Sequence, residues 1–337
     1  MSQLVYDGPP ALTAGRMLTS WTLDPVADVS IVVLAVSYVA GVRLVRRGGG
    51  QWPAGRTICF LGLGLGTFAV ATGSWIGVYA HSLFWVYAMQ IIVLLVVTPM
   101  FLALGGPLSL AIHVLTPAHR ERLQRWLNSR LAKLVTFPVL SSLLIATFPF
   151  LIYFTGWYEL SLRHYVVYEL LHVVLVIVGF VFVWPLAGVD FVPRRLPYAT
   201  VMLIAAVELL FDAFPGIIIR LRTHLIAPDY YTQLGRPWGH SLLADQRLGG
   251  AVLWFAGEVA ALPLLAIMGV QWVHADRTEA EEVDRELDLL APTSTGESAK
   301  PPDLVAPWWE TDPSRLGERG RRYLPDHQTK PGTGDPS

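Results

Sequence analysis

Ionisable side chains inside long apolar stretches are the residues of this sequence that could do chemistry. Glu169 and His172 lie three residues apart, so a helix places them on one face. Glu208 and Asp212 form an i, i+4 carboxyl pair in the next apolar stretch, and Glu258 lies in the one after it. A charged group at the centre of a bilayer costs about 2.5–3.5 kcal/mol. Such residues must therefore be paired with another group, be solvated in a cavity, or have a direct function such as ion binding.

We predict that acidic and imidazole side chains from the last three apolar stretches meet in one water-accessible pocket. The pocket would bind a metal cation or a proton near the outer surface of a membrane. Its predicted ligands are Glu169, His172, Asp212, Asp245 and Glu258. A polar network that only joins three helices, with Arg220 or Arg247 as counter-ion, is the alternative for the same residues.

Histidines add a second indication of metal chemistry. Imidazole nitrogen is a good ligand for copper and for haem iron. The histidines expected near the outer face are His81, His164, His172, His224 and His240. The thioether ligands that Cu(I) prefers are scarce, because Met89 and Met202 stand alone. The chain also lacks a phosphate-binding Gly-rich loop, a His-Glu-x-x-His motif and a Gly-x-Ser-x-Gly motif, so we do not expect an enzyme.

The elements that position these residues are expected to be membrane-spanning helices. Hydrophobic residues make up 53% of the 337 residues and charged residues only 15%, against about 25% in a soluble domain. The mean hydropathy is +0.47. A bilayer core of about 30 Å needs roughly 20 apolar residues in a helix. The stretches that qualify are 27–45, 57–78, 83–104, 134–155, 165–186, 198–219 and 251–272. The predicted fold is an all-α polytopic bundle of about seven transmembrane helices.

The distribution of Lys and Arg predicts the orientation of the bundle. Basic residues concentrate in the first, third and fifth connections, which should be cytoplasmic. The N-terminus would then lie outside and the C-terminus in the cytoplasm. The predicted organisation is an extracytoplasmic segment 1–26, a transmembrane domain 27–274 and a cytoplasmic tail 275–337. The tail begins as a charged, helix-compatible stretch over 276–288 and is expected to be disordered from Ala291 onward.

Several motifs in the apolar part are similar to those of one known family. They are the Pro-containing run 98–107 with its Leu-Gly-Gly-Pro ending, the Trp-Pro-Leu-Ala-Gly run 184–188, and the Asp-Gln-x-x-Gly-Gly run within 238–250. The sequence from about residue 73 to residue 263 thus resembles the CtaG-like cytochrome c oxidase assembly factors, seven-span proteins of bacterial membranes. The resemblance implies a plasma-membrane protein whose partners are cytochrome oxidase subunits and the lipid bilayer, with copper as the implied metal.

The chain departs from the family pattern at several histidines. Tyr87 and Ile91 stand where the resemblance implies a His-x-x-x-His pair, Tyr168 stands for a third histidine, and Asp212 for a fourth. Tyrosine and carboxylate oxygens favour harder cations over Cu(I), so we predict weak Cu(I) binding.

The functional prediction is a membrane assembly factor for a haem–copper cytochrome oxidase, assisting copper insertion at the outer face. Two alternatives stay open at this point. One is a cation- or proton-coupled transporter that uses Glu208 and Asp212 as its coupling site, and the other is a scaffold that holds partner subunits by its helix faces. The near-zero formal net charge, −1, argues against a nucleic-acid partner.

Overall fold

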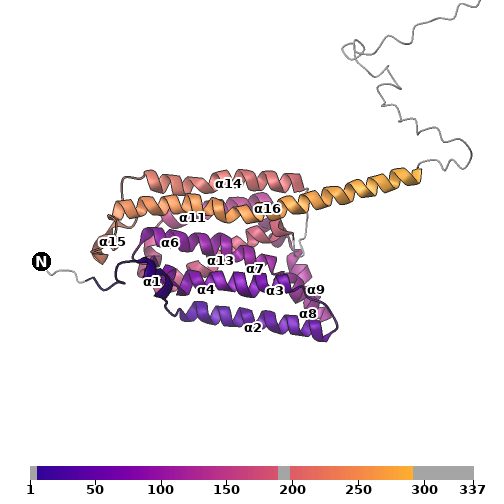
Figure 1. Cartoon of the computed structure of the whole chain (residues 1–337), viewed down its shortest axis with the longest axis horizontal. Coiled ribbons are helices and arrows are strands. Elements are labelled where there is room, and N and C mark those ends of the chain that lie inside the picture. Colours follow the sequence, from indigo (N-terminus) through magenta and orange to yellow (C-terminus); the bar gives the residue numbers. More distant parts are fainter. Residues whose placement is uncertain (1–5, 189–197, 291–337) are drawn as a thin grey trace, which may run out of the picture. The chain divides into compact units, whose positions relative to one another are not determined.

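The computed structural model describes residues 6–188 and 198–290, and it contains helices and no strand within them. This confirms the predicted all-α class. The elements, in chain order, are α1 (Ala14–Thr19), α2 (Pro25–Arg47), α3 (Ala54–Thr57), the π-helix η1 (Ile58–Gly64), α4 (Leu65–Gly73), α5 (Trp75–Ala80), α6 (Phe84–Ile92), the π-helix η2 (Val93–Val97), α7 (Thr98–Leu104), α8 (Pro107–Val114), α9 (Pro117–Leu127), α10 (Arg130–Val135), α11 (Pro138–Phe154), α12 (Trp157–Arg163), α13 (Tyr165–Ala187), α14 (Tyr198–Leu221), α15 (Pro228–Leu234) and α16 (Leu242–Leu290). Figure 1 shows the long helices running side by side.

Six continuous helical segments are long and apolar enough to cross a membrane. They are Pro25–Arg47, Ala54–Ala80, Phe84–Leu104, Tyr165–Ala187, Met202–Leu221 and Leu242–Arg285. Each corresponds to one of the predicted spans. A seventh exists only if the pair Pro138–Phe154 and Trp157–Arg163, bent by 65°, is taken as one span.

The fourth predicted span is therefore shorter than the sequence indicated. The prediction placed it at 134–155, whereas α11 begins at Pro138 and has 17 residues. Proline disfavours helical geometry in the residue before it and suits the first turn of a new helix. Phe137 is accordingly extended, with φ −67° and ψ 123°. The apolar residues before it belong to the separate helix α10.

The last membrane helix starts earlier than predicted. The sequence indicated 251–272, but α16 begins at Leu242 because Ser241 caps its N-terminus. The Ser241 carbonyl accepts from the Asp245 N–H at 2.9 Å, and its side-chain oxygen accepts from Ala244. Asp245 therefore lies inside the first turn of the helix. The charged stretch 276–288 continues the same helix, while the predicted disorder after Ala291 lies outside the described residues.

Two parts of the chain separate as compact units, Met1–Glu279 and Ala280–Ser337. The sites described below all lie in the first. At its centre α13 packs along η2 and α7, next to α4 and α6 (Figure 1). Gly179 is the closest point of approach: a Cβ there would overlap the carbonyl oxygen of Leu95 and lie 2.7 Å from Pro99 Cγ. The absence of a side chain at Gly179 thus sets how tightly these helices pack.

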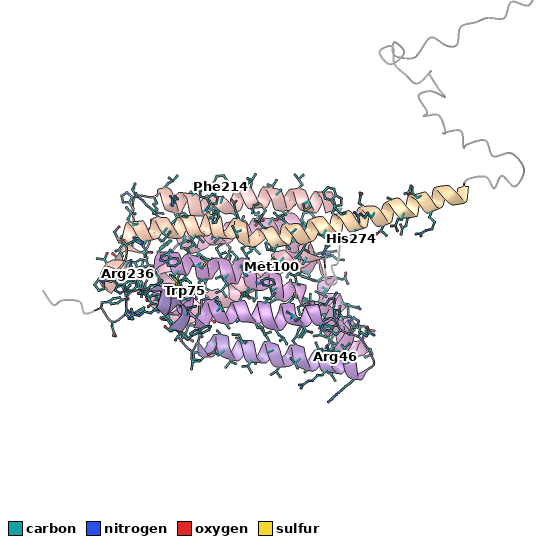
Figure 2. All side chains as sticks on the ribbon, in the orientation of Figure 1. Arg46, Trp75, Met100, Phe214, Arg236 and His274 are labelled. Atoms are coloured by element: carbon teal, nitrogen blue, oxygen red, sulfur yellow. The ribbon has the colours of Figure 1, made fainter. Side chains whose placement is uncertain are left out.

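The third connection is a structured cap on one end of the bundle. It folds into α8, α9 and α10, and α8 packs on α2, where Leu110 sits against Gly41. Arg46 lies at this end, whereas Arg236 lies at the opposite end, where α2 begins (Figure 2). The two ends differ in charge as well, because the basic residues of the first and third connections gather at the α8–α10 end.

Candidate functional site

Three buried ionisable side chains meet where α2 and α13 begin. Asp24 precedes α2 as its N-cap, and Glu169 and His172 lie one helical turn apart in the first half of α13. Their exposed fractions are 8%, 6% and 3%. One potential ligand atom from each residue lies within 4.8 Å of the others. We call this group the Asp24 cluster.

Local backbone geometry holds Asp24 in place. Its Oδ1 atom accepts hydrogen bonds from the N–H groups of Val26 at 3.1 Å and Ala27 at 3.2 Å. The hydroxyl of Tyr165 donates to the same oxygen at 3.3 Å. This is the usual capping arrangement of an aspartate before a proline-initiated helix. One carboxyl oxygen is thereby committed, and the other is left for Glu169 and His172.

The electrostatics of Asp24 reflect its surroundings. Burial raises the pKa of Asp24 above its ordinary value, and a side-chain hydrogen bond with Glu169 raises this pKa further. The capping hydrogen bond from Ala27 acts in the opposite direction. Burial thus disfavours the charged form of Asp24 and keeps its pKa above the ordinary value.

His172 is the least satisfied member of the cluster. Neither of its ring nitrogens has a hydrogen-bond partner among the described residues, and Glu169 Oε1 has none either. The Nδ1 atom of His172 lies 3.8 Å from Glu169 Oε2, which is too long for a hydrogen bond. Leaving a buried polar atom unpaired costs about 1–3 kcal/mol. An ion bound among the three side chains would provide the missing interactions.

Tyrosines surround the inner side of His172. The Tyr168 ring lies 4.1 Å from the imidazole of His172 and 4.5 Å from that of His81, between ring centroids. The hydroxyl of Tyr168 donates to Gln90 at 2.8 Å, and the hydroxyl of Tyr87 is hydrogen-bonded to Ser161 at 2.7 Å. Both tyrosines stand where the family resemblance implies histidines, and their ring centroids lie 6.0 Å apart. In this chain the hydroxyl groups of the two tyrosines are held by hydrogen bonds to Gln90 and Ser161.

His81, in the connection before α6, supplies a pH test of this region. Burial in the first place, and the nearby His172 in the second, lower the pKa of His81 from 6.5 to about 4. A histidine with a depressed folded-state pKa binds its proton more readily in the unfolded chain. Its stabilising contribution is therefore complete above pH 6.5 and is lost as the pH falls toward 4. We expect metal-free protein to lose thermal stability over this interval, and His81→Gln to lose less. Equal slopes of unfolding temperature against pH would contradict this assignment.

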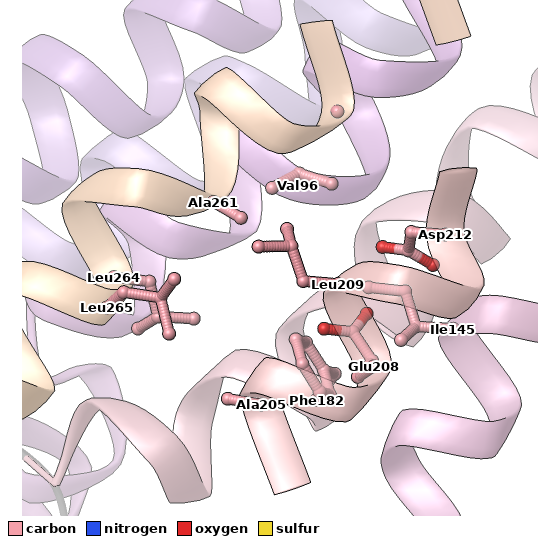
Figure 3. Close-up of a pocket in the computed structure, with 11 residues that line it drawn as sticks. Val96, Ile145, Phe182, Ala205, Glu208, Leu209, Asp212, Ala261, Leu264 and Leu265 are labelled. Atoms are coloured by element: carbon pink, nitrogen blue, oxygen red, sulfur yellow. The ribbon is translucent and has the colours of Figure 1, made fainter. Parts of the chain in front are cut away.

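Asp212 does not join the Asp24 cluster. It pairs with Glu208 one turn away on α14, with a side-chain hydrogen bond between the carboxyl groups. Figure 3 shows both carboxyl groups beside Leu209, facing α16. The cavity there has about 20 Å³, room for one water molecule. The role of this pair as a transporter's coupling site stays a prediction.

Glu258 and Asp245 have separate partners. Glu258 accepts a hydrogen bond from the indole of Trp254 at 2.9 Å. Asp245 Oδ2 lies 3.2 Å from Arg236 Nη2 and accepts from the Phe84 N–H at 3.1 Å. Asp245 thus ties the start of α16 to the start of α6.

The five predicted ligands therefore do not form the single pocket that the sequence predicted. Within residues 6–188 and 198–290, Glu169 and His172 come together, and the other three predicted ligands lie elsewhere. Asp212, Asp245 and Glu258 were grouped by their depth along their helices, but depth does not fix the direction in which a helix face points. The third member of the cluster, Asp24, was missed because it is an ordinary N-cap in the sequence. The available signal was an acidic residue directly before the first span, at the same predicted end as Glu169.

Comparison with known proteins bears on this site. The family model of the cytochrome c oxidase caa3 assembly factor, Caa3_CtaG, matches residues 36–275. The chain belongs to this family. Glu169 and His172 lie inside the Caa3_CtaG match, whereas Asp24 lies twelve residues before it. The membership confirms the resemblance inferred from the motifs.

Mycobacterial relatives extend the comparison without naming a function. Uncharacterized proteins of Mycobacterium bovis and Mycobacterium tuberculosis are each 32% identical over 292 residues, and one of Mycobacterium leprae is 32% identical over 293. The matches cover 85% of this chain but 44% of each relative. This Caa3_CtaG chain thus spans less than half the length of these relatives. No solved structure gives a significant match.

Proposed function

We propose that this chain assists assembly of a cytochrome c oxidase by handling copper as cargo at the end of the bundle where α2 and α13 begin. The observation that carries the proposal is His172, a buried imidazole beside the carboxyl groups of Glu169 and Asp24. Neither of its nitrogens has a hydrogen-bond partner in the part of the chain that the structure describes. Membership of the Caa3_CtaG family supports oxidase assembly as the process. Imidazole is a common ligand of copper.

The site is buried but lies close to the surface. Tyr165, whose hydroxyl donates to Asp24, is 54% exposed. A metal ion that entered past Tyr165 would meet Asp24, whose Oδ1 atom the Tyr165 hydroxyl contacts. Because the ion would only be held and passed on, no bond to carbon is made or broken, and the proposal is for a non-enzymatic factor.

The distribution of basic residues indicates on which side of the membrane the Asp24 cluster lies. Arginines of the first connection, Arg46 among them, lie at the end opposite Arg236 (Figure 2). Cytoplasmic connections carry the excess of Lys and Arg. We therefore assign the Asp24 cluster to the extracytoplasmic face of a bacterial plasma membrane, where the copper centre of an oxidase subunit would be filled.

Complementation of a deletion strain tests the proposal. Reduced-minus-oxidised spectra of membranes should lose the oxidase haem signal when the gene is deleted and regain it with the wild-type chain. His172→Ala should restore little of the signal at low copper and more at high copper. His164→Ala is the matched control, because His164 is an exposed histidine eight residues earlier at the same end. Full restoration by His172→Ala at low copper would refute the proposed role.

A further inference from the structure

We infer that the Asp24 cluster takes its metal as a divalent ion, Cu(II) in the case of copper, and rejects Cu(I). The inference rests on the proposed function for the identity of the cargo, but its geometric argument does not. It assigns Asp24, a residue outside the family match, as the side chain that sets the charge of the site.

The charge balance of the cluster favours a divalent ion. Asp24 and Glu169 supply two carboxylates, and His172 binds metal as a neutral imidazole. A divalent ion makes the occupied site neutral, whereas Cu(I) leaves one uncompensated negative charge among side chains that are at most 8% exposed. An unpaired charge in such surroundings is strongly disfavoured.

The donor atoms favour the same ion. The three ligands offer two oxygens and one nitrogen, and no sulfur. Cu(I) prefers thiolate and thioether ligands, whereas imidazole and carboxylate suit Cu(II) and Zn(II). The two structural arguments, charge and donor type, are independent of each other and agree.

The ligand atoms lie within 4.8 Å of one another and must move closer together to close around an ion. Ligand atoms bonded to zinc at about 2.1 Å lie roughly 3.0–3.4 Å apart. The 3.8 Å between Glu169 Oε2 and His172 Nδ1 is a few tenths of an ångström longer. Asp24 is fixed by its capping hydrogen bonds, so the ordering cost of one ligand is already met by the fold. Neither nitrogen of His172 has a hydrogen-bond partner within residues 6–188 and 198–290, which leaves either available.

The substitution Asp24→Asn removes one negative charge from the cluster and keeps the N-cap of α2. Asparagine caps a helix about as well as aspartate, so α2 should keep its start. The variant site carries one negative charge, which matches a monovalent ion instead of a divalent one. We expect Zn(II) and Cu(II) affinity to fall by about 100-fold or more, with Cu(I) affinity unchanged or higher. Asp28→Asn is the matched control, because it makes the same chemical change one turn further along α2, outside the cluster.

The experiment uses the full chain, purified without a polyhistidine tag, in lipid nanodiscs after chelator treatment. Zn(II), a redox-inert divalent probe, is titrated calorimetrically, and Cu(II) and Cu(I) are titrated against competing chelators, the latter under reductant. We expect one divalent ion per chain and loss of this site in His172→Ala. Folding of each variant is checked by its thermal unfolding.

Three results would overturn the inference: tighter binding of Cu(I) than of Cu(II), no divalent site that depends on His172, or equal divalent affinity in Asp24→Asn and wild type. A different result would refute the proposed function without refuting the divalent site. If the divalent site is present but His172→Ala restores the oxidase fully at low copper, the site stands and its role in oxidase assembly does not.

Discussion

Gly179→Ala is expected to abolish correct packing of the bundle. The added Cβ would overlap the Leu95 carbonyl oxygen, a backbone atom that cannot rotate away, and would press on the ring of Pro99. Neighbouring residues on α13, Leu175 and Val183, are 1% and 0% exposed, so the helix has no free space into which it can shift. Overpacking of a core commonly costs about 1–3 kcal/mol. With backbone as the obstacle we expect about 3 kcal/mol or more.

Two measurements check this expectation: the yield of monodisperse protein in mild detergent, and the temperature of unfolding. Gly66→Ala is the matched control. Gly66 is also a helical glycine of a membrane span, but a Cβ there meets nothing within 4 Å. This exchange should be neutral or stabilise the protein by up to about 1 kcal/mol, the difference in helix propensity. Gly179→Ala protein with wild-type yield and unfolding temperature would show that α13 and η2 can separate at little cost.

The second large effect is expected at the buried ion pair of Arg236 and Asp245. The two side chains are 1% and 2% exposed, and their closest atoms are 3.2 Å apart. Arg236→Gln leaves the Asp245 carboxylate buried without its counter-ion, although the Phe84 N–H still donates to it. Removing one partner of a buried pair costs about 3–5 kcal/mol. The starts of α6 and α16 should loosen together.

A double-mutant comparison isolates the charge. Asparagine at 245 keeps an oxygen that accepts from Phe84 but carries no charge, so Asp245→Asn added to Arg236→Gln should recover part of the lost stability. The same variants decide whether Asp245 is a metal ligand, as the sequence suggested. We expect Zn(II) binding at the Asp24 cluster to be unchanged in the folded double variant. Loss of Zn(II) binding in a double variant whose unfolding temperature matches that of the wild type would show that Asp245 is a metal ligand.

Much of the fold could be predicted because membrane helices are encoded locally. An uninterrupted run of apolar residues of the right length is sufficient for α2, α13 and α14, since a single apolar segment that crosses the bilayer satisfies its backbone hydrogen bonds internally only as a helix. The errors fall where local capping decides the boundary. Because of Pro138, α11 is shorter than the predicted span, and because of the Ser241 cap, α16 begins before the predicted span. Each boundary depends on a single residue and not on average hydrophobicity.

The site was predictable only where it is local. Glu169 and His172 follow from i, i+3 spacing on one helix. The contact of Asp24 with them joins residues more than 140 positions apart. The direction in which α14 presents Asp212 depends on packing against α16. The spacing of residues along one helix predicts neither relation.

The capping role of Asp24 also bears on how fragments of this family are chosen. A fragment that began at residue 36, the first position of the family match, would lack the first half of α2 together with Asp24. Its remaining cluster would hold one carboxylate and one imidazole, and α2 would start without its cap. The cation preference measured on such a fragment would describe a site of different charge, so domain boundaries drawn from sequence similarity alone would misreport the selectivity of the intact chain.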